Sequence, residues 1–138
     1  MSHATTRTLR VVGALIVDGD RFLLTQRRLD DASWPGFWEF PGGKVAPGES
    51  DPQALEREME EELGIEVEVV RQVDRVKLDL GDGNLLDFRV HLCRLLGGEP
   101  QPLEVADLRW VTAQEAAELD LPEADRPVLG RILAGGLP

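Results

Sequence analysis

A cluster of glutamates within residues 51–63 constrains the fold of this chain more than any other feature of its sequence. Ser50 is a typical helix N-cap, and Gln53 three residues later completes a capping box. Gly64 stands at a position suited to ending the helix. Between these ends, apolar residues recur at the spacing of one helix face: Leu55, Met59 and Leu63. The segment is therefore expected to form an amphipathic helix that packs against a core.

The glutamates are unevenly distributed around this predicted helix. Three of them lie along one edge of the apolar stripe: Glu58, Glu61 and Glu62. Like charges four residues apart, as at Glu58 and Glu62, destabilise a helix by roughly 0.2–0.5 kcal/mol, and a carboxylate near the core costs more. A divalent cation such as Mg²⁺ or Mn²⁺, which prefers hard oxygen ligands, would offset this repulsion. The alternative is a solvated acidic helix face, with Arg57 as its one basic residue.

Residues 43–65 resemble a complete Nudix box. The matching positions are Gly43, Glu49, Arg57, Glu58, Met59, Glu61, Glu62, Gly64 and Ile65. The resemblance implies an α/β fold, an α/β/α sandwich with a mixed β-sheet between helices. It also implies hydrolysis of a nucleoside diphosphate linked to a further group, with Arg57 orienting a glutamate of the site. The implied metal ligands are Glu58, Glu61, Glu62 and the carbonyl of Gly42.

Length and charge narrow the functional classes. A chain of 138 residues is expected to form one domain, residues 1–138, and its net charge of −11 argues against binding a nucleic acid polymer. For an enzyme that binds phosphates, the same charge requires cations and local basic residues at the site. The single cysteine, Cys93, excludes an internal disulfide, and residues 1–10 lack the apolar run of a signal peptide. We therefore expect a cytoplasmic protein without a membrane segment.

Strand patterns flank the predicted helix on both sides. Residues 9–17 and 21–26 are expected to pair through a turn at Asp18-Gly19, and a loop-rich segment, 29–48, follows. After the helix, the expected strands are 67–80, 85–96 and 108–111, with a further helix starting after Thr112. His91 and Cys93, in the second of these strands, are expected to have structural roles.

Four further residues are candidates for substrate binding, because they match positions that contact substrate in relatives acting on nucleoside triphosphates. Arg28 and Lys44 would contact phosphates, and Phe40 and Asp125 would contact the base. A solvated strand end is the alternative for Arg28, and no role is assigned to Arg27. Capping of the last helix is the alternative for Asp125. An aspartate accepts hydrogen bonds and, when protonated, also donates, so Asp125 does not fix which base is bound.

The resemblance implies attack by water on a phosphoanhydride phosphorus, which gives a nucleoside monophosphate and pyrophosphate. Mg²⁺, or Mn²⁺, would neutralise phosphate charge and lower the pKa of the water, and a carboxylate would accept its proton. The family does not use one position uniformly for this base. The candidates are Glu49, Glu58, Glu61, Glu62 and Glu104. For Glu104, an exposed loop acid is the alternative.

The segment 38–44, WEFPGGK, resembles the MutT-like branch of the family. The leading hypothesis is therefore an enzyme of the nucleotide pool acting on a (deoxy)nucleoside triphosphate, such as 8-oxo-dGTP. CTP or another pyrimidine nucleotide, coenzyme A and a nucleotide sugar are alternatives, although Ala32 stands where the coenzyme A branch has arginine. A non-catalytic nucleotide-binding module is disfavoured because no acid of the box is missing. Small relatives occur as monomers or homodimers.

Overall fold

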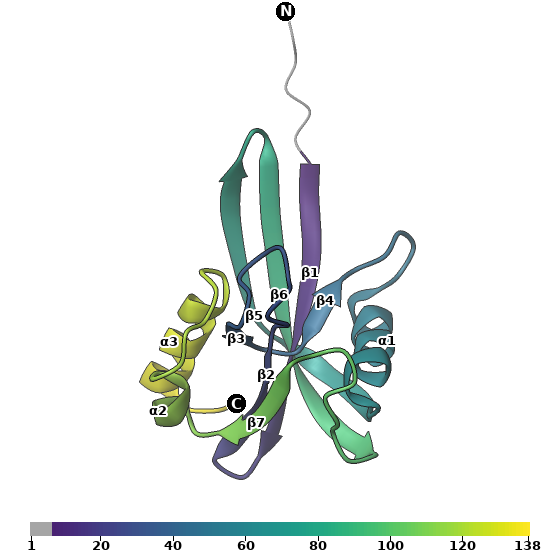
Figure 1. The fold of residues 1–138 in the computed structure, drawn as a ribbon, viewed down its shortest axis with the longest axis vertical. Helices are drawn as coiled ribbons and strands as arrows, with labels where there is room; N and C mark the ends of the chain where they lie inside the picture. Colours follow the sequence, from purple (N-terminus) through teal and green to yellow (C-terminus); the bar gives the residue numbers. More distant parts are fainter. Residues whose placement is uncertain (1–6) are drawn as a thin grey trace, which may run out of the picture.

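The computed structural model describes residues 7–138 and shows a seven-stranded mixed β-sheet with helices on both faces (Figure 1). The first six residues lie outside the described residues. They belong to residues 1–10, for which no signal peptide is expected from the sequence. The strands are β1 (Arg7–Asp18), β2 (Arg21–Gln26), β3 (Trp38–Glu39), β4 (Gly42–Lys44), β5 (Glu66–Gly81), β6 (Asn84–Gly97) and β7 (Asp107–Val111). The helices are α1 (Asp51–Leu63), α2 (Ala113–Ala116) and α3 (Asp125–Gly135).

The strand order is β3-β2-β1-β6-β5, with β4 paired to β1 and β7 paired to β2. β1 and β6 are parallel from Arg7↔Asn84 to Ile16↔Cys93, whereas the other pairs are antiparallel. Helix α1 covers one face, and α2 and α3 cover the other (Figure 1). The predicted α/β/α sandwich with a mixed sheet is therefore confirmed.

The central strand β1 is buried on both faces from Val12 to Ile16, and the side chains of this part alternate between two cores. Val12, Ala14 and Ile16 pack with the apolar stripe of α1. Leu15 packs on the opposite side, in the core that includes residues of α3. This alternation is the period of two expected for an extended chain, and it fixes which face of the sheet each helix covers.

The predicted strands agree with the observed ones to within two residues at each end. The segment 29–48, expected to be loop-rich, contains the short strands β3 and β4, which were not predicted. The helix expected after Thr112 is a single turn, α2, and the predicted capping box from Thr112 to Glu115 is present. Among residues 7–138, no helix is both long and apolar enough to cross a membrane.

Beyond the helical layers, β1, β5 and β6 continue as a long three-stranded extension (Figure 1). Leu9 and Val11 of β1 pair with Leu86 and Phe88 of β6, so these side chains share one face of the extension. Leu78 of β5 pairs with Leu86 and adds to the same face. This apolar face forms one wall of the cavity described below.

Candidate active site

The helix α1 has the predicted ends. The side chain of Ser50 accepts from the N–H of Gln53, whose side chain accepts from Ser50 in return, and Gly64 adopts a left-handed conformation at the C-cap. Leu55, Met59 and Leu63 are fully buried. Burial of this stripe fixes the rotation of the helix, and it leaves the edge with Glu58 and Glu62 facing the sheet.

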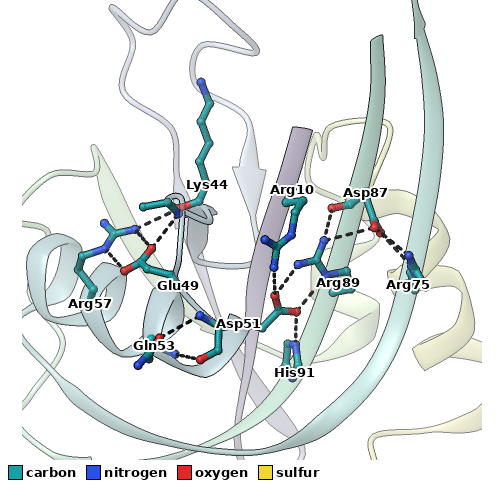
Figure 2. Close-up of polar contacts among 12 residues, drawn as sticks. Arg10, Lys44, Glu49, Asp51, Gln53, Arg57, Arg75, Asp87, Arg89 and His91 are labelled. Carbon is teal, nitrogen blue, oxygen red and sulfur yellow. Dashed lines mark hydrogen bonds and ion pairs between the residues drawn. The ribbon is translucent and has the colours of Figure 1, made fainter. Parts of the chain in front are cut away.

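Arg57 organises the acids near the start of α1. Its Nε and Nη2 atoms donate to the two carboxylate oxygens of Glu49 at 2.8 and 2.9 Å (Figure 2). Its Nη1 atom donates to Glu58 at 3.0 Å and to Glu61 at 3.3 Å. Hydrogen bonds from Arg57 and from the N–H of Ala46 lower the pKa of Glu49 to about 2. Glu49 is therefore a weak base, suited to holding Arg57 in place.

Two glycines allow β4 to approach its neighbours closely. A Cβ atom on Gly43 would lie 2.6 Å from the carboxyl carbon of Glu58, so this carboxyl group lies directly against the backbone of β4. A Cβ atom on Gly42 would lie 1.9 Å from the carbonyl oxygen of Val12. β4 can therefore pair with β1 in this register only if residue 42 is glycine. The predicted ligand Gly42 is thereby placed in the same cavity as Glu62.

Glu62 is the most perturbed carboxyl group of the helix. Burial, and then the negative charges of Glu58 and Glu39, raise its pKa to about 9. Burial also raises the pKa of Glu58, although Arg57 opposes this change. Two carboxyl groups in mutual contact and partly out of water cannot both ionise without a compensating cation. In the protein alone, a retained proton relieves their repulsion.

Glu104 lies close to Glu62 because the chain before β7 closes the end of α1. The N–H groups of Leu103 and Glu104 donate to the carbonyl of Glu62 at 3.0 and 3.2 Å. Both glutamates line the same cavity, and the charge of Glu104 contributes to the raised pKa of Glu62. The structure therefore brings together two acids that are far apart in sequence.

The carboxyl groups of Glu58 and Glu62 fit a divalent cation by their chemistry. They are hard oxygen donors in contact, and within the described part of the chain Glu62 forms no ion pair. Glu61 differs, since its side chain is 49% exposed and pairs with Arg57. Across residues 7–138, no three histidine, cysteine, aspartate or glutamate side chains already converge as a metal cluster. A metal role for Glu61 therefore stays a prediction.

A cavity of about 560 Å³ extends from Glu62 and Glu104 to α3. Near α1 and β4, its lining includes Gly43, Lys44 and Glu62. Its other lining residues include Phe40, Phe88, Leu86, Val11 and Asp125. Glu62 of α1 and a largely apolar wall thus line one continuous cavity, and its volume is in the range of small-molecule sites.

Asp125 is buried at the start of α3 but does not cap that helix. The N-cap is Ala124, which makes no side-chain cap bond, so helix capping is the wrong reading of Asp125. Its carboxyl group instead accepts the N–H of Phe40 at 3.1 Å. Burial, together with the negative charge of Glu39, raises its pKa well above the ordinary value. Asp125 therefore contributes a buried carboxyl group to the cavity wall, and Phe40 joins this group to the segment that follows β3.

The predicted residues Phe40, Arg28 and Lys44 all line the cavity. The ring of Phe40 stacks on Phe22 with centroids 5.7 Å apart, so its N–H, not its ring, is the group directed at Asp125. Arg28 is exposed and pairs with Asp30 at 3.0 Å. Lys44 is exposed, and its side chain extends away from Arg57 and Glu49 (Figure 2). The basic groups at the cavity are therefore accessible to an anionic ligand.

Sequence reasoning missed Glu39, which β3 places in the cavity wall next to Phe40. Burial raises the pKa of Glu39, and the positive charge of Arg27 opposes this change. The signal was its position in the WEFPGG segment, where an acid precedes the buried Phe40. β3 has only two residues, so its sequence shows no periodic pattern that predicts which way the side chain of Glu39 points.

A second polar cluster, also not predicted, surrounds Asp51 at the first turn of α1 (Figure 2). Arg89 and His91 of β6 both contact its carboxylate, His91 with Nε2 at 2.9 Å, and Arg10 reaches it at 3.5 Å. Burial acts to raise the pKa of Asp51, but the bonds from Arg89 and His91 outweigh it and lower the pKa to about 2. The predicted structural role of His91 agrees with this contact, and Cys93 is buried as expected.

A comparison with protein families agrees with this fold and cavity. The chain matches the NUDIX domain over residues 7–132, and it belongs to this family of Nudix hydrolases. Members of the family generally use a divalent metal, which agrees with the contact between Glu58 and Glu62. The resemblance inferred from the glutamate cluster is thereby confirmed.

Several named proteins are similar to the chain. It is 43% identical over 116 residues to "Putative 8-oxo-dGTP diphosphatase 2" of Mycobacterium tuberculosis strain H37Rv, with 84% of this chain and 82% of that protein covered. It is 36% identical to "CTP pyrophosphohydrolase" of Escherichia coli K12, with 93% of each covered. The crystal structure of a MutT NUDIX hydrolase from Burkholderia pseudomallei superposes with a TM-score of 0.76 at 33% identity, covering 91% of this chain and 98% of that one.

Proposed function

We propose that this protein is a magnesium-dependent pyrophosphohydrolase of (deoxy)nucleoside triphosphates, which acts on an oxidised or otherwise modified nucleotide of the cytoplasmic pool. One observation carries the proposal: a single cavity joins Glu62 of α1 and the neighbouring Glu104 to a pocket that has apolar walls and buried carboxyl groups. A nucleoside triphosphate needs both parts, since its phosphates require cations and its base requires an apolar slot with a few polar groups.

The residues near α1 would act on the phosphates. Glu58 and Glu62, with the carbonyl of Gly42, would hold Mg²⁺ or Mn²⁺, and Glu61 is a further candidate. The cation would neutralise phosphate charge and favour ionisation of the attacking water. Arg28 and Lys44 would contact the leaving phosphates, where the net charge of −11 makes local basic groups necessary.

Proton transfer needs a carboxylate that is not already committed to a strong ion pair. Glu49 is a poor candidate because Arg57 holds its pKa at about 2. Glu104 is a better candidate, because it is exposed, lines the cavity and lies beside Glu62. Water would attack phosphorus, the phosphoanhydride P–O bond would break, and the products would be a nucleoside monophosphate and pyrophosphate.

Base recognition would involve Asp125 and Glu39, with the apolar wall against the faces of the base. A protonated carboxyl group can donate to a ring nitrogen or carbonyl, and an ionised one can accept from an amino group. An 8-oxopurine nucleotide is supported by the 43% identity with the mycobacterial relative. CTP is the second candidate, supported by the 36% identity with the Escherichia coli relative over 93% of both chains.

The test is hydrolysis of a nucleotide panel with Mg²⁺, comparing 8-oxo-dGTP, dGTP, CTP, dCTP, ADP-ribose and coenzyme A. We expect a triphosphate to be the best substrate and pyrophosphate, not orthophosphate, to be released. Reaction in ¹⁸O-labelled water shows which phosphorus is attacked, because the label enters only that product. A preference for ADP-ribose or coenzyme A, or release of orthophosphate alone, would contradict the proposal.

A further inference from the structure

Arg27, the residue without an assigned role, connects three parts of the cavity wall through its guanidinium group. Its Nη1 atom donates to both carboxylate oxygens of Glu39, at 3.0 and 3.3 Å. Its Nε atom donates to the carbonyl of Ser33 at 2.8 Å, and its Nη2 atom pairs with Asp31 at 3.1 Å. All three nitrogen atoms of the group are therefore engaged by oxygen atoms of the protein.

The backbone of Arg27 also closes the loop that follows it. Its N–H donates to the carbonyl of Phe37 at 2.8 Å, and its carbonyl accepts from the N–H of Gly36 at 3.2 Å. The loop 28–36 thus starts and ends at Arg27, and its residues Asp31, Ser33 and Trp34 line the cavity. Arg27 therefore fixes both the loop and the side chain of Glu39 on β3.

Arg27 differs from the neighbouring Arg28 in what remains available for a ligand. Arg28 is 59% exposed and has one local partner, Asp30. Arg27 is 25% exposed, and its donors are committed to Glu39, Ser33 and Asp31. A guanidinium group has five N–H donors in fixed directions, so a group used in this way has little capacity left for a phosphate. Its effect on the substrate must pass through the groups that it holds.

The group that transmits this effect most directly is Glu39. Its side chain is 22% exposed, and it lines the cavity together with Asp125. The next residue, Phe40, donates its N–H to Asp125, so a change in the position of β3 reaches both carboxyl groups. A planar guanidinium fixes the orientation of a carboxylate, whereas the ammonium group of lysine supplies a charge without that geometry.

We propose that Arg27 is a positioning residue for base selectivity, which acts by fixing the carboxylate of Glu39 beside Asp125 at the base end of the cavity. This inference rests on the proposed function and extends it to a residue that does not itself touch the base. Loss of the guanidinium frees Glu39 to rotate, whereas the backbone hydrogen bonds of residue 27 to Gly36 and Phe37 still hold the loop that carries Arg28. Discrimination between bases then falls, while the chemistry at the phosphates is retained.

The experiment compares Arg27→Met, Arg27→Lys, Glu39→Gln and the double variant Arg27→Met with Glu39→Gln. Arg71→Met is the matched control, since Arg71 is an exposed arginine of β5 outside the cavity lining. The substrates are nucleoside triphosphates that differ only in the base, together with ribose 5′-triphosphate, which has none. kcat and KM are measured for each, and selectivity is the ratio of kcat/KM between the best and the worst base.

We expect Arg27→Met to lower this ratio by about tenfold or more, the size expected for a charged hydrogen bond, chiefly through KM of the preferred base. Arg27→Lys falls between the wild type and Arg27→Met. In the Glu39→Gln background, Arg27→Met has no further effect on selectivity, because the two residues act through one contact. Hydrolysis of ribose 5′-triphosphate changes by less than about twofold, the scatter expected among variants outside the catalytic contacts.

Other results would overturn the inference. An unchanged ratio in Arg27→Met, or a parallel loss on ribose 5′-triphosphate, would mean that Arg27 only maintains the fold or the phosphate site. Additive effects of Arg27→Met and Glu39→Gln would mean that Arg27 does not act through Glu39. Failure of the wild type to release pyrophosphate from any triphosphate would instead contradict the proposed function, so the two failures are distinguishable.

Discussion

The two ends of α1 each hold a half-buried carboxyl group, and their surroundings are opposite in character. At the first turn, Asp51 contacts Arg89 and His91, and its pKa falls to about 2. In the last turn, burial and the acids Glu58 and Glu39 raise the pKa of Glu62 to about 9. The helix dipole adds to this contrast, because it favours negative charge at the N-terminus and disfavours it at the C-terminus.

The difference separates a structural carboxylate, Asp51, from Glu62, for which we propose a functional role. The charge of Asp51 is balanced within the chain, so nothing further needs to bind there. The charges of Glu58 and Glu62 are balanced only in part, by Arg57 on the side of Glu58, and a ligand from outside can complete the balance. Strongly perturbed carboxyl groups in a cavity are typical of functional sites for this reason.

Substitution at the C-terminal end of α1, where the carboxyl charges are balanced only in part, should have the largest effect on catalysis. Glu62→Gln removes the anionic oxygen expected to hold the cation but preserves the shape of the side chain. We expect kcat to fall by roughly 10²–10³-fold, the size seen when one group that stabilises transition-state charge is removed. The measurement is steady-state kinetics with saturating Mg²⁺.

Glu56→Gln is the control for Glu62→Gln, because Glu56 is an exposed glutamate of the same helix. It should leave kcat unchanged, and both variants should keep the far-UV circular dichroism spectrum of the wild type. Wild-type turnover by Glu62→Gln with saturating Mg²⁺ would remove the metal assignment.

Substitution of Asp51, at the N-terminal end of α1 where the charge is balanced, should affect stability and not catalysis. Asp51→Asn removes the carboxylate that contacts His91 and the closer of the two that contact Arg89, whose other partner, Asp87, stays at 3.3 Å. Both side chains are only 7% exposed. Removing one partner of a buried ion pair typically costs about 3–5 kcal/mol, and because Arg89 keeps Asp87 we expect the lower part of this range and a fall in Tm of about 10 °C. Calorimetry measures the change, and kcat at low temperature should stay within about threefold of the wild type if the site is intact.

Asp20→Asn, at an exposed turn position, is the control for Asp51→Asn and should leave Tm nearly unchanged. If Asp51→Asn melted within a few degrees of the wild type, the cluster around Asp51 would not contribute to stability. If it instead lost activity without losing stability, the assignment of the two ends of α1 would be reversed.

Much of the fold follows from local sequence signals. The capping box at Ser50, the apolar stripe from Leu55 to Leu63 and the left-handed Gly64 together define α1. The long strands followed from runs of apolar and β-branched residues. β3 and β4 could not be predicted, because strands of two and three residues are too short to show a period. Their pairing with β2 and β1 is decided by tertiary contacts.

The candidate site was predictable where its residues share one helix and less so where they come from separate elements. Glu58 and Glu62 are neighbours by helical spacing. The contacts of Asp51 with Arg89 and of Arg27 with Glu39 join separate parts of the fold, so no local pattern indicates them. The pairing of Glu61 with Arg57, in contrast, follows from their i,i+4 spacing on α1.

The raised pKa of Glu62 should make the binding of Mg²⁺ depend on pH. Glu62 retains its proton below a pKa of about 9, so a cation that binds there must displace this proton. Affinity for Mg²⁺ should therefore rise by up to about tenfold per pH unit from pH 6 to 8 and level off near pH 9. Calorimetric titration in buffers of different ionisation enthalpy measures the affinity and the protons released, and a flat profile would contradict the shared proton.

Without metal, the pKa shifts of Glu62 and Asp51 predict that stability changes with pH in opposite directions. The folded pKa of Glu62 is raised, so the unfolded state releases its proton first, and Tm should fall as pH rises from about 5 toward 9. The folded pKa of Asp51 is lowered, so its contribution is present above about pH 4 and is lost as pH falls toward 2. Glu62→Gln should remove the first slope and leave the second.

A substitution in β4 with a smaller expected effect tests whether the contact between β4 and α1 holds Glu58 in position. In Gly43→Ala, the new Cβ atom would meet the carboxyl group of Glu58 at 2.6 Å, so Glu58 must shift. Overpacking of this kind typically costs about 1–3 kcal/mol, and we expect Mg²⁺ affinity to fall by about tenfold. Gly130→Ala in α3, where no atom lies within 4 Å of the new Cβ, is the control. Equal Mg²⁺ affinity in the two variants would mean that the position of Glu58 against β4 is not what prepares the pair for a cation.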